Sequence, residues 1–147
     1  MSTSTLDPEA RFAISDLILR YGTAIDTRDW GLFRGIFTDD AYIDYTAAGI
    51  GTFTSADDFA QAMRKGHAPF GKTMHRLTNI VINAGDAITA RTYGDAIVMA
   101  ADNTTGHHAA AWYDDEIVHT TNGFKIARRT ITMVLFEAIR TNLAATS

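Results

Sequence analysis

An aspartate beside the apolar stripe of a predicted helix is the first candidate for chemistry in this chain. In the stretch LILRYGTAIDTRDW, residues 17 to 30, apolar side chains recur at helical spacing, and Asp26 directly follows the last of them, Ile25. At 100° per residue this carboxylate lies close to the apolar side and away from the charged flank. Asp26 therefore either ends the helix as a cap or faces a partner inside the protein, and the pattern leaves both interpretations open.

In the second half of the chain, strand parity decides which histidine and arginine side chains point inward, because successive strand residues point to opposite faces. His75 and Arg76 both share a face with apolar residues, so parity leaves open which of them points inward. Arg129 is in phase with apolar residues and Arg128 with threonines, which predicts that Arg129 points into an apolar space. A neutral imidazole can accept a proton near physiological pH, and a guanidinium can stabilise negative charge.

The adjacent histidines His107 and His108 suggest a metal site, but parity argues against it. Neighbouring strand residues point to opposite faces, so both rings are not expected to bind one ion. The sequence contains no HExxH spacing, and we expect no metal and no cofactor. His108 shares its predicted face with Trp112, and His107 shares the other with small alanines, a composition compatible with a cavity wall.

Helices dominate the first part of the chain and strands the second. Helix caps and apolar periodicity predict three helices and then four long strands separated by turn compositions such as NAGD and TTNG. The predicted helices cover residues 8–26, 29–37 and 55–66, a further strand covers AYIDYT at 41–46, and the long strands cover 73–83, 87–101, 107–119 and 124–136. The tail after Phe136 is expected to be a short extension that frays.

This order of elements predicts an α+β domain. A long, mainly antiparallel sheet needs one covered face, so it is expected to curl around the N-terminal helices as a cone-shaped half-open barrel. Such a barrel offers a cavity for a small molecule, although the same layout could be packed solid.

Length and composition bound the class of protein. The 147 residues suit a single domain over 1–147. The net charge of -4 argues against a nucleic-acid partner, because it provides no positive potential to attract phosphates. The longest apolar run, AIVMAA at 96–101, is too short to span a bilayer, and the N-terminus lacks the apolar segment of a secretory signal. No cysteine is present. We expect a cytoplasmic protein without membrane or nucleic-acid partners.

Several segments together resemble the SnoaL-like branch of the nuclear transport factor 2-like superfamily. The resemblance runs from about Arg11 to Phe136 and rests on AISDL, AIDTRDW, DDAYIDY, GIGTF, MHRLTN, GDAIV and GFKIARR, in that order. Within this branch the segments are most similar to scytalone dehydratase and hexachlorocyclohexane dehydrochlorinase. The resemblance implies a cone-shaped fold and a homo-oligomer, with a trimer favoured over a dimer.

The resemblance also implies a catalytic histidine–aspartate dyad. Asp26 occupies the position of the aspartate and His75 that of the histidine, while Tyr21, Tyr45 and Arg129 match polar groups around the substrate in relatives. His108 lies near a second active-site histidine, with a shifted register. The positions expected to line the substrate pocket are Ile43, Phe70, Ala96, Val98 and Trp112.

In such a dyad the carboxylate fixes the imidazole tautomer and stabilises the imidazolium after proton transfer. We therefore expect a cofactor-independent, dehydratase-like lyase that eliminates water or another small leaving group from a hydrophobic cyclic substrate. Isomerisation, epoxide hydrolysis and a non-catalytic binding or assembly role are the alternatives. Each single residue also has a structural interpretation, as a helix cap, a core aromatic or a buried ion pair.

Overall fold

The computed structural model describes residues 5–143 and begins with its longest helix, α1 (Pro8–Thr27). Asp7 caps this helix by accepting a hydrogen bond of 2.7 Å from a backbone N–H of the first turn. The proline at the first helical position has no N–H and therefore needs no acceptor. The helix ends at Arg28, which adopts a left-handed conformation with φ 58°. The predicted first helix is confirmed, and Asp26 lies in its last turn.

Two shorter helices and one helical turn follow α1. Helix α2 (Trp30–Gly35) is capped by Asp29, and α3 (Ala56–His67) is capped by Ser55; both cap side chains accept a backbone N–H. A 3₁₀ turn, η1 (Thr46–Ala48), lies between them. The second and third predicted helices therefore exist with shifted ends, as is usual for boundaries read from sequence.

Six strands form one sheet in the order β2-β1-β6-β5-β4-β3. The strands are β1 (Phe37–Tyr45), β2 (Gly51–Phe53), β3 (Phe70–Ala84), β4 (Ile88–Ala100), β5 (Thr105–Thr120) and β6 (Gly123–Arg140). Strands β3 to β6 form an antiparallel meander, whereas β1 pairs with β6 in parallel. The predicted α+β class with a mainly antiparallel sheet is confirmed.

The end of the chain corrects one expectation. Strand β6 does not stop at Phe136 but continues to Arg140, which pairs with Thr105 at the start of β5. Residues 137–140 are therefore part of the sheet, because the partner strand supplies backbone hydrogen-bonding groups that a sequence pattern does not reveal. Two further expectations, the fraying of the last residues and the absence of a secretory signal at the N-terminus, concern residues that lie partly outside the described range.

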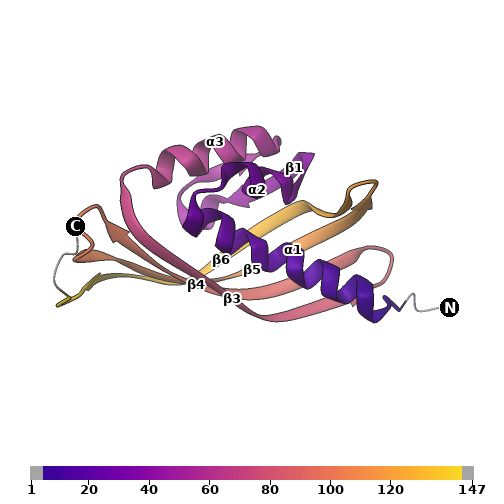
Figure 1. Ribbon diagram of the computed structural model, residues 1–147. Coiled ribbons are helices and arrows are strands. Elements are labelled where there is room, and N and C mark those ends of the chain that lie inside the picture. Colours follow the sequence, from indigo (N-terminus) through magenta and orange to yellow (C-terminus); the bar gives the residue numbers. More distant parts are fainter. Residues whose placement is uncertain (1–4, 144–147) are drawn as a thin grey trace.

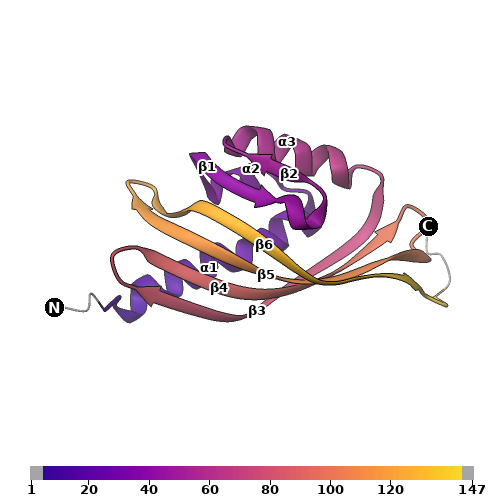
Figure 2. The same ribbon diagram turned by 180° about the vertical axis from the view of Figure 1, so that it is seen from behind.

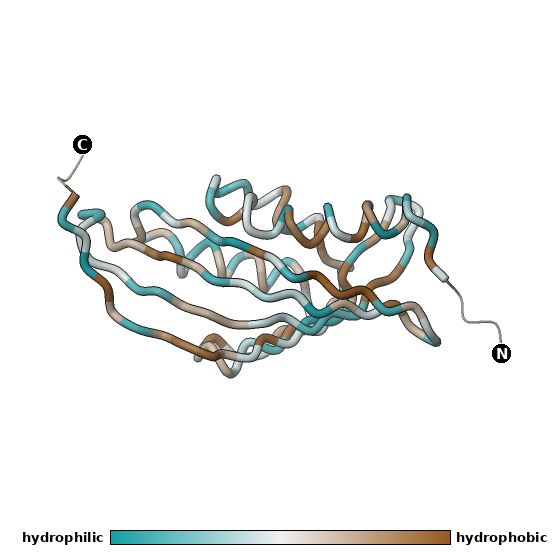
Figure 3. The backbone as a smooth tube through the Cα atoms, turned by 90° about the horizontal axis from the view of Figure 1, so that it is seen from below, coloured by the Kyte–Doolittle hydropathy of each residue, from teal (hydrophilic) through white to brown (hydrophobic). Residues whose placement is uncertain are grey.

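The three helices cover one side of the curved sheet (Figure 1), and the view from behind shows the other side uncovered (Figure 2). Along the long strands, apolar and hydrophilic segments follow one another (Figure 3). Because successive strand residues point to opposite faces, one set of side chains meets the helices and the other lies on the outer face. The core is formed by fully buried side chains such as Ile18, Phe33, Phe37 and Phe59.

A glycine allows α1 to approach β3 closely. A Cβ added at Gly22 would lie 2.9 Å from Leu77 Cδ1 and 3.0 Å from the backbone oxygen of His75. Any larger residue would push the helix away from the strand. Gly22 lies one helical turn before Asp26, so this close approach brings the aspartate to the strand that carries His75.

Between residues 5 and 143, no helix is long and apolar enough to cross a membrane.

Candidate active site

A cavity of about 480 Å³ lies between α3, the end of α1 and the inner face of the sheet. One row of paired residues crosses four strands of its wall: His75 pairs with Ala96, Ala96 with Ala109, and Ala109 with Phe136. The small side chains in the middle of this row leave space, and the larger ones at its ends close the sides. The wall is therefore mostly apolar with a few polar groups, as is typical of ligand sites.

His75 and Asp26 form a hydrogen-bonded pair at this cavity. The Asp26 Oδ1 atom lies 2.7 Å from His75 Nδ1, and Asp26 Oδ2 accepts the backbone N–H of His75, also at 2.7 Å. Because an ionised carboxylate only accepts, Nδ1 carries the proton and Nε2 is left as the basic nitrogen. The His75 side chain lines the cavity and is 11% exposed, so a ligand can reach it.

Two further residues hold the Asp26 carboxylate in place. The Thr73 hydroxyl donates to Asp26 Oδ1 at 2.8 Å and accepts a hydrogen bond of 2.9 Å from Arg28 Nη1. Arg28 also donates to the backbone oxygen of Gly71 at 3.0 Å. This chain of hydrogen bonds ties the end of α1 to the start of β3 and orients the aspartate toward His75.

The surroundings of Asp26 keep it ionised. Burial by itself raises the pKa of its carboxyl, but hydrogen bonds from the His75 ring, the His75 backbone and the Thr73 hydroxyl outweigh burial and lower this pKa below its ordinary value. The dyad therefore contains a carboxylate at neutral pH, which is the state that stabilises an imidazolium.

Three tyrosines form a polar patch on the cavity wall. The hydroxyls of Tyr21 and Tyr45 are 2.7 Å apart, and the Tyr113 ring lies 5.5 Å from that of Tyr21. Burial raises the pKa of all three phenols above the ordinary tyrosine value, so they are neutral hydroxyl groups that can donate to a ligand oxygen. All three line the cavity.

Behind the tyrosines lies a buried ion pair. Arg129 binds Asp115 through two hydrogen bonds of 2.7 Å, and both side chains are fully buried. The guanidinium carbon of Arg129 lies 4.6 Å from the ring centre of Tyr21 and 4.4 Å from that of Tyr113, within the range of cation–π attraction. Although burial opposes its charge, the pairing with Asp115 raises the pKa of Arg129 well above its ordinary value. Arg129 is therefore in the interior, as parity predicted, but behind the wall that a ligand touches.

The structure separates the other expected site residues into two groups. Phe70, Ala96 and Val98 line the cavity. Ile43 is fully buried in the helix-covered core and does not line the cavity, because β1 lies under α3 at that point. Trp112 lies on the outer face, where the guanidinium of Arg91 is 5.3 Å from its ring.

His108 also lies away from the cavity. Its Nε2 atom is 3.1 Å from Asp95 Oδ2 and its Nδ1 atom is 3.4 Å from Glu137 Oε1, within a polar row on the outer face. The neighbouring His107 lines the cavity instead, as strand alternation requires. We therefore leave His108 out of the site that we propose.

Four residues that the sequence did not single out contribute to the site. Thr73 and Arg28 support the dyad, Tyr113 completes the tyrosine patch, and His67 lines the cavity at the end of α3. Tyr113 shares the predicted face of His107 and was therefore within reach of a parity argument. The other three contacts depend on the crossing of helix and strand.

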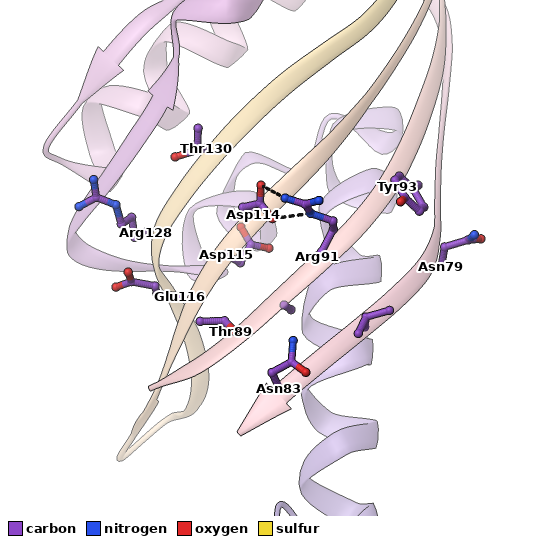
Figure 4. Close-up of a pocket in the computed structure, with 12 residues that line it drawn as sticks. Asn79, Asn83, Thr89, Arg91, Tyr93, Asp114, Asp115, Glu116, Arg128 and Thr130 are labelled. Atoms are coloured by element: carbon purple, nitrogen blue, oxygen red, sulfur yellow. Dashed lines mark hydrogen bonds and ion pairs between the residues drawn. The ribbon is translucent and has the colours of Figure 1, made fainter. Parts of the chain in front are cut away.

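A second hollow, of about 550 Å³, lies on the outer face of β3 to β6 (Figure 4). Two of its charged side chains are paired with each other, because Arg91 binds Asp114 through hydrogen bonds of 2.7 and 2.9 Å. The cavity at His75 combines an apolar wall with a dyad and neutral donors, so it is the better candidate for chemistry. Among the described residues, no three histidine, aspartate or glutamate side chains gather as a metal site.

Comparison with known protein families identifies the family of this chain. The model of the SnoaL-like domain matches residues 7–130, which include the dyad and all three tyrosines. This chain belongs to the SnoaL-like family. An uncharacterized protein of Mycobacterium tuberculosis strain H37Rv is 33% identical to this SnoaL-like chain over 121 residues, which cover 81% of the chain and 82% of that relative.

Solved structures share the SnoaL-like fold over nearly the whole chain. A provisionally named aromatic ring hydroxylase from Novosphingobium aromaticivorans has a TM-score of 0.80 and 25% identity, covering 92% of this chain and 96% of its own. A provisionally named scytalone dehydratase from the same species has a TM-score of 0.79 and 19% identity, covering 94% and 95%. A type 2 hexachlorocyclohexane dehydrochlorinase has a TM-score of 0.80 and 21% identity, covering 95% and 94%.

Proposed function

We propose that this protein is a cofactor-independent lyase that eliminates water or another small leaving group from a hydrophobic cyclic substrate. The observation that carries the proposal is the Asp26–His75 pair, whose free ring nitrogen belongs to a residue of the cavity wall. Two structural relatives bear the names of a dehydratase and a dehydrochlorinase, which are both eliminating enzymes.

In the proposed reaction, His75 Nε2 takes a proton from the carbon next to the one that bears the leaving group. The electron pair of the broken C–H bond forms the new double bond, and the bond to the leaving group breaks. For a hydroxyl leaving group, the imidazolium returns its proton to the departing oxygen, which releases water and restores neutral His75. Asp26 stabilises the imidazolium while it exists.

The tyrosine patch supplies the other half of the proposed mechanism. Because the hydroxyls of Tyr21 and Tyr45 are bonded to each other, one of these two hydroxyls keeps a free proton. We infer that this hydroxyl, or that of Tyr113, donates to a substrate oxygen that gains negative charge as the proton leaves. The guanidinium of Arg129, stacked on two of these rings, adds positive potential from behind the wall. Donors that are already in place lower the barrier without reorganisation.

The same geometry favours elimination over an isomerisation in which a carboxylate acts directly on the substrate. Asp26 uses both oxygens on His75 and also accepts from Thr73, so it is committed to orienting the imidazole. The open cavity beside His75 also supports an enzyme over a packed assembly module.

The test is turnover of a panel of cyclic β-hydroxy ketones and chlorinated cyclohexanes by the wild type, His75→Ala and His108→Ala. We expect elimination of at least one compound, a loss of roughly 10²–10⁴-fold in His75→Ala, and no loss in His108→Ala. A wild type that binds these compounds without converting any of them, or an active His75→Ala variant, would contradict the proposal. The first of these results would instead indicate a ligand-binding protein.

A further inference from the structure

A second histidine, His67, lines the same cavity as His75. It is the last residue of α3, and its ring centre lies 6.0 Å from that of Trp30 and 5.5 Å from that of Phe70. Its ring centre is 6.2 Å from that of His75. The two imidazoles are therefore neighbours on one wall, although they come from a helix and a strand.

The tautomer of His67 follows from its backbone contact. Its Nδ1 atom lies 2.9 Å from the Met63 backbone oxygen, one of the free carbonyls at the end of α3. A carbonyl oxygen can only accept, so Nδ1 carries the proton and the lone pair of the neutral ring is on Nε2. Among residues 5–143, no side chain donates a hydrogen bond to this nitrogen.

Burial above all keeps the His67 ring neutral. Burial lowers the pKa of His67, and the nearby His75 and Arg28 lower it further, whereas the Met63 carbonyl and Asp26 act in the opposite direction. The net pKa is below the ordinary histidine value, so Nε2 is an acceptor and not a donor near neutral pH.

Two histidines thus present acceptor nitrogens on one wall of an otherwise mostly apolar cavity. His75 donates through Nδ1 to Asp26, and His67 donates through Nδ1 to Met63. Nε2 of His75 takes part in the proposed proton transfer. Nε2 of His67 can accept a hydrogen bond from a hydroxyl group of the ligand. A bare ring or a halide at the same position would leave this acceptor without a hydrogen bond, which costs binding free energy.

We propose that His67 binds a hydroxyl group of the ligand through Nε2 and thereby selects hydroxyl-bearing cyclic compounds over unsubstituted or halogenated ones. Applied to the substrate, this inference rests on the proposed function, and it then favours dehydration over dehydrohalogenation. As a statement about binding, it can be measured without turnover.

The test compares the affinity of 2-naphthol with that of naphthalene, titrated by NMR into the wild type and variants. We expect the wild type to prefer 2-naphthol by about 3–10-fold, the range of one neutral hydrogen bond. His67→Phe should remove this preference, and His67→Gln, whose amide oxygen can accept, should restore part of it. The matched control is His107→Phe, because His107 lines the same cavity and stacks on Phe136 at 4.7 Å.

Unchanged preference in a folded His67→Phe variant, or its loss in His107→Phe alone, would overturn the assignment. The ¹⁵N spectrum of the wild type provides a measurement that needs no variant. We expect His67 Nε2 to be unprotonated and to shift with 2-naphthol but not with naphthalene, and a protonated Nε2 would also overturn the assignment. These results are independent of His75→Ala turnover, so failure of this inference is distinguishable from failure of the proposed lyase activity.

Discussion

The two faces of the sheet carry nearly identical arginine–aspartate pairs in opposite settings. Asp114 and Asp115 are consecutive residues of β5, and each binds an arginine through two hydrogen bonds. The Arg91–Asp114 pair on the outer face has side chains 50% and 44% exposed, whereas both side chains of the Arg129–Asp115 pair are 0% exposed. The chemistry is the same, and only the side of the strand differs.

The histidine–aspartate pairs repeat this contrast. On the inner side, Asp26 is 2.7 Å from His75, and no arginine between residues 5 and 143 is bound to it. In the other pair, Asp95, which also borders the cavity, is 3.1 Å from His108 and is bound by Arg76. Only the inner histidine lines the cavity. Both pairs contain the same residue types. The inner pair is the candidate for catalysis because its histidine reaches the cavity and its aspartate is not also bound by an arginine.

The largest effect is expected when the inner ion pair is broken. Arg129→Met leaves Asp115 buried without a counter-charge and should lower the free energy of unfolding by about 3–5 kcal/mol. Urea unfolding followed by circular dichroism measures this loss. The matched variant Arg91→Met should change stability little, because its pair is exposed to solvent. Equal losses in the two variants would refute the contrast between the faces.

A smaller effect, on turnover and not on folding, is expected for the dyad. Asp26→Asn keeps the shape of the side chain but cannot stabilise an imidazolium, so turnover should fall by at least about 10²-fold. The comparison variant is His108→Ala on the outer face, which should keep full activity. Steady-state kinetics on a substrate from the panel decides this, and a fully active Asp26→Asn enzyme would remove the dyad from the mechanism.

Gly22→Ala should test the close approach that brings the inner pair together. The new methyl group would meet Leu77 and the His75 backbone, which should cost about 1–3 kcal/mol of stability, partly offset by the better helix propensity of alanine. The control is Gly66→Ala in α3, where an added Cβ meets nothing within 4 Å. Thermal unfolding should show a lower midpoint for Gly22→Ala and no loss for Gly66→Ala. The reverse order would exclude tight packing at Gly22.

The smallest expected effect is on the pH dependence of stability. Because the folded-state pKa of Asp26 is lowered, its carboxylate stabilises the fold above the unfolded-state pKa of about 3.9. This contribution is lost as pH falls through the folded-state pKa. The difference in unfolding free energy between wild type and Asp26→Asn should therefore shrink below about pH 4. A difference that is constant from pH 7 to pH 3 would mean that the lowered pKa is absent.

Much of the scaffold could be predicted because its signals are local. The cap at Asp7, the apolar periodicity of α1 and the turns between the long strands each involve a few neighbouring residues. Strand alternation also correctly separated Arg129 from Arg128 and His107 from His108. The resemblance to the SnoaL-like family placed Asp26 and His75 in one site, which local pattern alone left open.

The remaining contacts lie between segments distant in sequence. The parallel pairing of β1 with β6 and the continuation of β6 to Arg140 depend on partner strands. Thr73 reaches Asp26 because α1 packs on β3, and His67 lies beside His75 although α3 itself packs on β1 and β2. No local periodicity encodes such crossings.

The sequence by itself determined the three helices and the four long strands, apart from their ends, and which side chains alternate between the faces of the sheet. These properties follow from backbone geometry and residue spacing. Only the tertiary structure decided that Asp26 meets His75 at an open cavity and that Arg129 is sealed behind tyrosines. It also decided that His67 joins the site. The physical reason is that accessibility and partner choice depend on how packed elements approach one another, and at Gly22 that approach is set by the absence of a single methyl group.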